Sequence, residues 1–368
     1  MKFARFSPEA FYPECHFNNQ TRKGQLAVQR LPRPVIKAEI YPSLFAFADV
    51  FYFICSMEKK YEIHFAPLQG YTDWIYRNIF ARFFEGIDVY YTPFVRVEKG
   101  ITFRNRDLRD IDPANNTVAC QIPQILPASP EEFRLLAALL QAKGYTRADI
   151  NLGCPFPLIA GQKKGAGMLP YPDLVGAVLA TVAEFPAIRF SVKMRLGWSD
   201  KQECLNLLPV LNACPLTHIT LHARTGKQQY KGETDPELFE HFYRECRHSL
   251  FYNGDLNSVQ QIQMILQRFP ELKGVVLGRG LLSNPALAEN LRYDRSEPAD
   301  SFSRKKDFME ALFRAYRDYL KDERVLLQKM KSYWEYFLPD ADRKLKKKLQ
   351  KAKKIADYQE IVNLIFKA

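Results

Sequence analysis

From residue 62 onward the chain alternates between short runs of β-branched, aromatic and aliphatic residues and longer stretches with apolar positions at helical spacing. Each short run ends in glycine or polar residues, as strands do where a loop begins. There are eight such runs, at 62–67, 87–94, 117–123, 148–155, 189–197, 218–225, 249–256 and 274–282. The alternation predicts parallel strands that are each followed by a helix.

Three of the intervening stretches carry clear helix signals. Residues 129–144 begin with Ser129 as N-cap, Pro130 in the first turn and Glu132 three residues after the cap, and they end at Gly144. Residues 171–186 and 257–270 have apolar residues at helical spacing. Eight strand–helix units over about 230 residues match a (β/α)8 TIM barrel, and a doubly wound sheet is the alternative.

Beyond residue 300 the pattern is helical, which predicts a small C-terminal all-α helical domain. Residues 301–368 contain 18 Lys and Arg and 10 Asp and Glu, and so carry most of the formal net charge of +12. We expect an N-terminal extension of uncertain role at 1–56, a barrel at 57–298 and a basic helical domain at 299–368. The extension shows no repeating pattern, and we expect it to be dispensable, with Met57 as the true start.

Composition narrows the class of protein. The chain has 368 residues, of which 47% are hydrophobic, enough for one large core. Its positive charge favours a polyanionic partner, either nucleic acid or an acidic membrane surface. The seven scattered cysteines argue against a disulfide framework or a zinc site and favour a reduced, cytoplasmic setting. The longest apolar run, 44–57, is too short to span a membrane and is not placed like a signal peptide.

Charged side chains stand near the carboxyl ends of the predicted strands, where a TIM barrel has its active site. Lys193 and Arg195 lie two residues apart on the fifth strand and share a face, and His222 and Arg224 repeat this on the sixth. They either form structural ion pairs inside the barrel or bind an anionic or electron-rich ligand. Carboxylates are scarce on the neighbouring strand ends, which favours a ligand.

Glycines and amides stand at other strand ends. "NGD" (253–255) on the seventh run and "GRG" (278–280) on the eighth favour a phosphate site, because backbone N–H groups can approach an anion there. Gln121 and Asn151 add amides that can bind the edge of a heterocycle. Amides, a lysine and a phosphate site together predict a bound flavin mononucleotide (FMN).

Cys154 lies at the mouth of the fourth strand, three residues after Asn151. Most isolated cysteines are inert small hydrophobic residues, but a thiol beside a cofactor pocket can serve as nucleophile or general acid. The following "GQKKGAG" (161–167) lacks the ending of a phosphate-binding P-loop. We expect this segment to be a mobile lid that carries Cys154 over the substrate.

The basic C-terminal segment also contains aromatic residues, most of which we expect in its core. The run Lys346, Lys347 and Lys348 is either part of a surface that tracks nucleic-acid phosphates or a solvated helix face.

Seven motifs resemble, in order, those of the tRNA-dihydrouridine synthases: "APLQGYTD" (66–73), "NLGCP" (151–155), "GAGML" (165–169), "VKMRLG" (192–197), "HART" followed by "YKG" (222–232), "NGD" (253–255) and "GRG" (278–280). The resemblance covers about residues 62–285 and extends into the helical tail at "KMKSYW" (329–334). It implies a flavoprotein that reduces a uridine in tRNA to 5,6-dihydrouridine, with FMN as cofactor and NADPH as reductant. "APLQG" departs from the family pattern at the side chain that packs on the flavin.

The resemblance also implies roles for individual residues. The expected FMN contacts are Pro67, Leu68, Gly70, Gln121, Lys193, His222, Asn253, Asp255, Gly278 and Arg279. Asn151 and Arg195 are expected to face the uracil, and the expected substrate contacts also include Arg224, Lys346 and Lys347. Cys154 is the expected acid: flavin hydride adds to uracil C6, and a thiol that is largely protonated at neutral pH gives a proton to C5.

Two other functions remain open. An FMN-dependent TIM-barrel oxidoreductase acting on a small dihydropyrimidine or enone leaves the basic tail unexplained. A non-catalytic RNA-binding protein leaves Cys154, Lys193 and His222 at one rim unexplained. For the main hypothesis we expect a monomer that binds tRNA and NADPH, with no metal site and no membrane partner.

Overall fold

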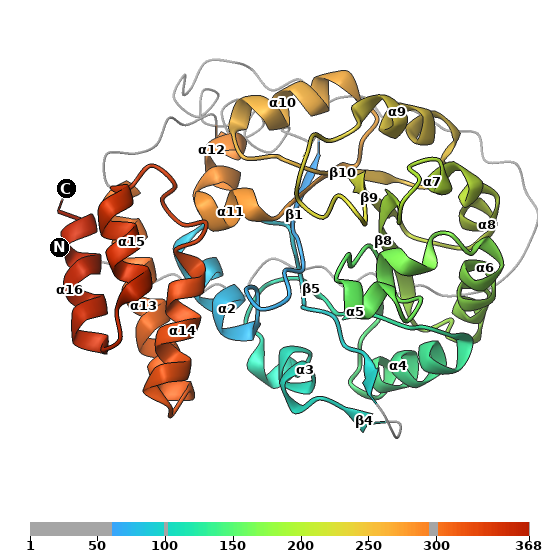
Figure 1. The fold of residues 1–368 in the computed structure, drawn as a ribbon. Coiled ribbons are helices and arrows are strands. Elements are labelled where there is room, and N and C mark those ends of the chain that lie inside the picture. Colours follow the sequence, from blue (N-terminus) through green and yellow to red (C-terminus); the bar gives the residue numbers. More distant parts are fainter. Residues whose placement is uncertain (1–60, 99–101, 294–300, 368) are drawn as a thin grey trace, which may run out of the picture. The chain divides into compact units, whose positions relative to one another are not determined.

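The computed structural model describes residues 61–98, 102–293 and 301–367. Nine strands form one sheet, in the order β5-β2-β1-β11-β10-β9-β8-β7-β6, and every pair in it is parallel (Figure 1). The strands are β1 (Glu62–Phe65), β2 (Val89–Tyr91), β5 (Gln121–Ile122), β6 (Gln124–Ile125), β7 (Arg147–Leu152), β8 (Arg189–Gly197), β9 (Ile219–Thr225), β10 (Leu250–Asn253) and β11 (Gly274–Leu277). A short antiparallel hairpin, β3 (Val97–Glu98) with β4 (Thr102–Phe103), lies outside this sheet.

The two end strands of the sheet, β5 and β6, are halves of one strand that is interrupted at Pro123. Proline has no N–H to donate to the ladder, but the Pro123 carbonyl still accepts from the Asp149 N–H at 2.9 Å. Counting both halves as one gives eight strands in a ring, with β1 paired to β2 on one side and to β11 on the other. The predicted TIM barrel is therefore confirmed, and the doubly wound sheet is wrong.

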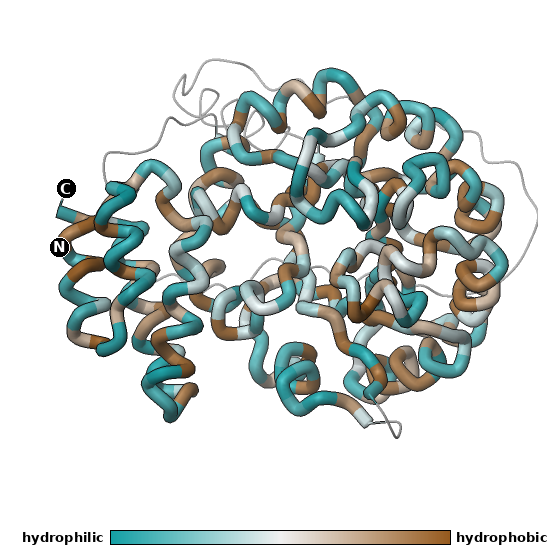
Figure 2. The backbone as a smooth tube through the Cα atoms, viewed as in Figure 1, coloured by the Kyte–Doolittle hydropathy of each residue, from teal (hydrophilic) through white to brown (hydrophobic). Residues whose placement is uncertain are grey.

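Helices follow the strands around the barrel (Figure 1): α2 (Trp74–Phe83), α3 (Asn105–Asp110), α4 (Pro130–Ala142), α5 (Pro157–Ala160), α6 (Pro172–Ala180), α7 (Glu203–Asn206), α8 (Leu208–Ala213), α9 (Pro236–Glu245), α10 (Val259–Arg268), α11 (Arg279–Ser283) and α12 (Leu287–Tyr293). Short 3₁₀ turns lie at Pro113–Asn115, Gly165–Met168 and Thr181–Glu184. Figure 2 shows hydrophobic and hydrophilic segments alternating along the outer helices, the pattern of helices that cover a core on one side.

The predicted helix at 129–144 shows how the local signals act. Its Ser129 side chain accepts from the Glu132 N–H, and Pro130 occupies the first turn. The chain leaves the helix at Gly144, whose φ of 80° is one that glycine adopts without strain. The predicted third strand was set too early, because the paired residues extend beyond residue 123 to Ile125.

Four helices follow the barrel: α13 (Ser301–Tyr319), α14 (Glu323–Tyr333), α15 (Arg343–Lys351) and α16 (Ile355–Ile365). The expected all-helical tail is confirmed. Phe308 on α13 packs edge-on against Phe80 and Phe84, at ring-centroid distances of 6.1 and 5.2 Å, within one hydrophobic cluster that the tail shares with the barrel. The expected division at 298/299 falls among residues 294–300, outside the described residues, and stays a prediction, as does the extension at 1–56.

Polar contacts also join the tail to the loop after β1. Lys329 Nζ donates to Asp73 Oδ2 at 2.7 Å and to the Gly70 carbonyl at 2.8 Å. Tyr316 donates its hydroxyl to Asp73 Oδ1 at 2.5 Å, and Tyr71 donates to Glu335 Oε2 at 2.9 Å. The loop that leaves the first strand is thus held by the helical tail.

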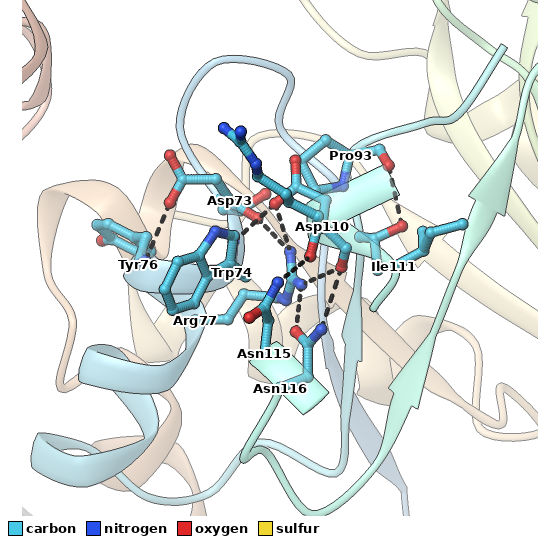
Figure 3. A network of polar contacts seen from close by, with 12 residues as sticks. Asp73, Trp74, Tyr76, Arg77, Pro93, Asp110, Ile111, Asn115 and Asn116 are labelled. Atoms are coloured by element: carbon cyan, nitrogen blue, oxygen red, sulfur yellow. Dashed lines mark hydrogen bonds and ion pairs between the residues drawn. The ribbon is translucent and has the colours of Figure 1, made fainter. Parts of the chain in front are cut away.

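A second polar network fixes α2 against the segment after α3 (Figure 3). The buried guanidinium of Arg77 donates to the carbonyls of Thr72 and Asp110, at 2.7 and 2.8 Å, and to Asn116 Oδ1 at 2.5 Å. Asp110 Oδ1 accepts from the Trp74 N–H at 2.8 Å. Burial raises the pKa of Asp110 to about 7, and the charge of Arg77 opposes this rise.

Asp110 should make the stability of the protein depend on pH. Because its folded-state pKa lies above the unfolded value, the folded state binds the proton more tightly, and the free energy of unfolding falls as pH rises from about 4 to about 7. Asp110→Asn should remove roughly 2–3 kcal/mol of the difference in unfolding free energy between pH 5 and pH 8, measured by urea titration. Asp112→Asn, at a partly exposed cap nearby, is the control; equal losses in both variants would contradict the assignment.

Candidate active site

A cavity of about 610 Å³ lies at the carboxyl ends of the barrel strands. Its lining includes eleven of the predicted site residues: Pro67, Leu68, Asn151, Cys154, Lys193, Arg195, His222, Asn253, Asp255, Gly278 and Arg279. They come from the ends of β1, β7, β8, β9, β10 and β11, so the closed ring of strands brings together residues far apart in sequence. Their roles stay predictions, but their shared location follows from the fold.

Cys154 is half-buried, and its loop is fixed from two sides. The side-chain oxygen of Asn151 accepts from the main-chain N–H of Cys154 at 2.8 Å, and the Cys154 carbonyl accepts from the Ala166 N–H at 3.1 Å. Gly165 has φ of 57°, and a Cβ there would lie 2.8 Å from Cys154 Cβ, so this close approach requires glycine. Burial raises the pKa of the Cys154 thiol, which keeps it protonated at neutral pH.

The second half of the segment expected to be a lid, residues 164–167, is buried. Lys164 is buried and pairs with Glu132 at 2.9 Å, and all four residues of Gly165–Met168 are buried. A Cβ at Gly167 would lie 2.1 Å from the Ala160 carbonyl oxygen. Gly165 and Gly167 therefore serve close backbone packing, whereas residues 161–163 are exposed, and the expected mobile lid stays a prediction.

Lys193 and His222 face the cavity from neighbouring strands. Lys193 Nζ donates to Asn253 Oδ1 at 2.9 Å. Burial, followed by the nearby charge of Arg195, lowers the pKa of Lys193 to about 8. Burial and the surrounding cations hold the pKa of His222 well below its usual range, so the ring is neutral. Its Nε2 is buried and has no hydrogen-bond partner within the described part of the chain.

Arg195 is held by main-chain carbonyls. It donates through Nε to Gly153 at 3.0 Å and through Nη1 to Thr225 and Gln229, each at 2.8 Å. Burial lowers its pKa to about 10, still well above neutral, so it remains a cation at neutral pH. The guanidinium carbon also lies 5.5 Å from the centre of the Tyr230 ring.

Asp255 corrects the expectation that carboxylates are scarce here. It forms ion pairs with Arg224 and with Arg279, the latter at 2.8 Å. Arg224 is buried, also donates to the Gly232 carbonyl, and does not line the cavity. Its geometry fits a structural ion pair inside the barrel, the less favoured of the two interpretations of its sequence position. The pairs hold the pKa of Asp255 below its usual value despite its burial.

The loops after β10 and β11 form one wall of the cavity, as expected for a phosphate site. Asn253 Nδ2 donates to the Val276 carbonyl at 2.7 Å, which ties these two strands together. A Cβ at Gly280 would lie 2.2 Å from the Leu256 carbonyl oxygen, so only glycine fits where the two loops touch. Arg279 lies over the Tyr230 ring, 4.5 Å from its centre.

Four other predicted residues lie outside the cavity lining. Gln121 donates to the Tyr145 hydroxyl at 2.6 Å, and the Gly70 carbonyl accepts from Lys329. Lys346 on α15 donates to the carbonyls of Phe337 and Leu338, at 3.1 and 3.2 Å, in the loop between α14 and α15. Lys347 is exposed on α15.

Several cavity residues were not predicted from the sequence. Arg96 and Arg104 come from the segment between β2 and α3, Arg106 comes from the first turn of α3, and Tyr230 and Tyr336 come from loops. Arg96 and Arg104 share a carboxylate, Glu98, at 2.8 and 3.4 Å, whereas the Arg106 side chain is 66% exposed. Arginines at irregular spacing outside the strands give no periodic signal in the sequence. Tyr230 could have been found, because it is the first residue of the "YKG" motif.

No group of three or more His, Cys, Asp or Glu side chains in the described residues is arranged to hold a metal ion. In the same part of the chain, no single helix is long and apolar enough to cross a membrane. One bent pair of helices, Pro157–Met168 with Pro172–Glu184, is together long and apolar enough for a membrane span by length and composition only.

Known proteins resemble this chain along most of its length. The family model described as dihydrouridine synthase matches residues 64–367. A tRNA-dihydrouridine(16) synthase from Neisseria meningitidis is 30% identical over 257 residues, which are 66% of this chain and 74% of that protein. A tRNA-dihydrouridine synthase B from Pasteurella multocida is 25% identical over 235 residues, 64% of this chain and 70% of that protein.

Among solved structures, a morphinone reductase is 13% identical, with a TM-score of 0.47 over 65% of this chain and 89% of that one. The family model, in contrast, covers both the barrel and the helical tail, from β1 to the end of α16. On this match, the chain belongs to the dihydrouridine synthase family.

Proposed function

We propose that this protein is a flavin-dependent tRNA-dihydrouridine synthase, which binds FMN in the barrel cavity and reduces a uridine of tRNA with NADPH as reductant. One observation carries the proposal: a protonated thiol, several cations and an imidazole whose Nε2 has no hydrogen-bond partner among the described residues converge on one cavity at the carboxyl ends of the strands. Family membership and the names of the relatives support the same reaction.

The residues of the cavity fit FMN. The buried His222 Nε2 needs a hydrogen-bond partner, and Lys193 and Asn253 place a cation and an amide beside it. A volume of about 610 Å³ is in the range of pockets that take cofactors and substrates. Gly278, Arg279 and the loop after β10 would hold the phosphate, and Pro67 and Leu68 would lie beside the ring.

Bound FMN supplies the hydride that uracil receives at C6. The chain supplies the proton and the charge stabilisation. The Cys154 thiol keeps its proton at neutral pH because it is buried, and it can therefore donate to C5. Arg195 is a fixed cation, held by three main-chain carbonyls, and can stabilise the negative charge that develops on the uracil oxygen.

Exposed cations at the cavity rim and on the helical tail support a tRNA substrate. Arg106 is exposed at the cavity rim, and Lys347 and Lys348 are exposed on α15. A uridine in folded RNA must be turned out of its stack to enter a cavity, and contacts to the flanking phosphates can offset that cost. We therefore assign the barrel to catalysis and residues 299–368 to tRNA binding. NADPH, a monomeric state and a cytoplasmic setting stay predictions from the sequence.

Cys154→Ala tests the reaction. The purified wild-type protein should contain flavin and form dihydrouridine in unmodified tRNA when NADPH is supplied, as measured by mass spectrometry of nucleosides. The variant should keep flavin and tRNA affinity and slow turnover by roughly 10²–10⁴-fold, the range for loss of a general acid. Cys246→Ala, at a half-buried cysteine outside the cavity, is the control. Undiminished turnover in Cys154→Ala would exclude the thiol as proton donor, and a flavin-free wild-type protein would exclude the reaction.

Lys193 should make FMN affinity depend on pH. With a pKa of about 8, the lysine is a cation at pH 7 and mostly neutral at pH 9, so affinity should fall by up to about tenfold in total between pH 7 and pH 9. Flavin fluorescence on the apo-protein measures this. Lys193→Met should bind more weakly at pH 7 and lose the slope, whereas Lys143→Met, outside the cavity, should keep it. The same slope in Lys193→Met would rule out this lysine as the source.

Lys347→Gln combined with Lys348→Gln tests the tail. If both lysines contact phosphates, tRNA affinity should fall and the slope of log affinity against log salt should decrease by up to about 1–2 units. Arg189→Gln with Lys273→Gln removes two exposed cations at the opposite end of the barrel and is the matched control. Equal slopes in the wild type and the Lys347/Lys348 variant would mean that this run is a solvated helix face. A flat slope in the wild type would favour a small-molecule substrate.

A further inference from the structure

A chain of hydrogen bonds inside the barrel connects Asp149 to the main chain of Cys154. Asp149 Oδ2 accepts from Gln124 Nε2 at 2.7 Å, and Gln124 Oε1 accepts from Asn151 Nδ2 at 2.7 Å. Asn151 Oδ1 accepts from the main-chain N–H groups of Gly153 and Cys154, at 2.9 and 2.8 Å. Asp149, Gln124 and Asn151 are all buried, so each donor has to find its acceptor within the protein.

The direction of every bond in this chain is fixed by its two ends. Main-chain N–H groups only donate, so Asn151 must present its oxygen to them and its NH₂ to Gln124. Gln124 must then present its oxygen to Asn151, and its own NH₂ needs an acceptor on the other side. An ionised carboxylate only accepts, and Asp149 provides it; its second oxygen accepts from Ser191 Oγ at 2.6 Å.

We propose that Asp149 is a positioning residue for Cys154, which acts through Gln124 and Asn151 to fix the main chain that carries the thiol. The inference rests on the proposed role of Cys154 as proton donor. Asp149 is not among the residues that line the cavity. It lies on β7 two residues before Asn151, and Gln124 on the neighbouring strand β6 bridges the two side chains.

The competing explanation is a purely electrostatic role, because the charge of Lys193 acts on Asp149. Two nearly isosteric substitutions separate the explanations. Asp149→Asn removes the charge but keeps an oxygen that can accept from Gln124, while its NH₂ can donate to the Ser191 hydroxyl. Asp149→Leu removes both the charge and the acceptor and leaves the Gln124 NH₂ unpaired.

Hydrogen exchange of the Gly153 and Cys154 amides, followed by mass spectrometry of peptides that span residues 152–156, measures the end of the chain directly. Exchange in Asp149→Leu should be at least about tenfold faster than in the wild type, and Asp149→Asn should stay within about threefold. Gln124→Met should match Asp149→Leu, and the double variant should be no faster than either single one, because both break the same chain. Equal exchange in Asp149→Asn and Asp149→Leu would overturn the proposal.

Exchanging the two ends of the chain gives a second test, which does not depend on whether Asp149→Leu folds. In Asn151→Asp, the Gln124 side chain lies between two carboxylates. Its NH₂ can donate to one of them, but its oxygen then faces the other carboxylate without a donor. Adding Asp149→Asn restores a donor opposite the Gln124 oxygen, with every bond between residues 149 and 151 reversed. Exchange at Gly153 and Cys154 should be fast in Asn151→Asp and return toward the wild-type rate in the double variant. A double variant no slower in exchange than Asn151→Asp would overturn the proposal.

Turnover separates this proposal from the proposed function. If both proposals hold, Asp149→Leu should lower kcat for dihydrouridine formation with little change in KM for tRNA. Asp149→Asn should instead keep kcat near the wild-type value. If Cys154→Ala is fully active, the proposed function of the thiol fails, whereas the exchange rates still decide whether Asp149 positions the loop. If exchange responds to Asp149→Leu but kcat does not, positioning by Asp149 has no part in catalysis and the proposal fails.

Discussion

The polar groups inside the barrel obey one constraint: a donor or acceptor that points into a closed ring of strands must be paired there, because leaving it unpaired costs several kcal/mol. The network of Asp149, Gln124 and Asn151 meets this constraint entirely within the protein. His222 Nε2 does not, within the described residues, and it faces the cavity. Thr220 Oγ1, two residues before His222 on β9, is a second buried atom without a partner in the described part of the chain. The paired network thus supports the Cys154 loop, and the unmet hydrogen bond of His222 marks the cavity as a binding site.

Much of this could be predicted from the sequence, because strand and helix periodicities follow from local geometry. All eight strands were found, and in a parallel barrel their carboxyl ends must meet, which placed residues as distant as Leu68 and Arg279 together. The prediction failed where local geometry is irregular. Pro123 interrupts the third strand, so the paired residues continue to Ile125, and Gln124 rather than Gln121 lies beside Asn151.

Contacts between elements were the other limit. Asp255, which pairs with Arg224, lies in a loop and has a φ of 44°. This backbone conformation is unusual for a residue other than glycine, and a strand pattern of period two does not predict it. The motif around Gly70 predicts a contact with the flavin, but the Gly70 carbonyl accepts a hydrogen bond from Lys329, more than 250 residues later in the chain. Such contacts depend on how the tail docks, which is set by the shared core around Phe308 rather than by either segment alone.

The docked tail also changes what the cavity can bind. Tyr336 lines the cavity from the tail. The loop that contains Pro67 and Leu68 continues to Asp73, which Lys329 of the tail binds. The cavity also contains two cations, Lys193 and Arg195. Besides burial, Arg195 lowers the pKa of Lys193, and Arg279 is among the charges that lower the pKa of Arg195, while Asp255 is already paired with two arginines. Repulsion between cations held in a buried site is relieved by an anion or an electron-rich ring. The same electrostatics therefore favour a flavin phosphate, an RNA backbone and an enolate-like uracil in one place.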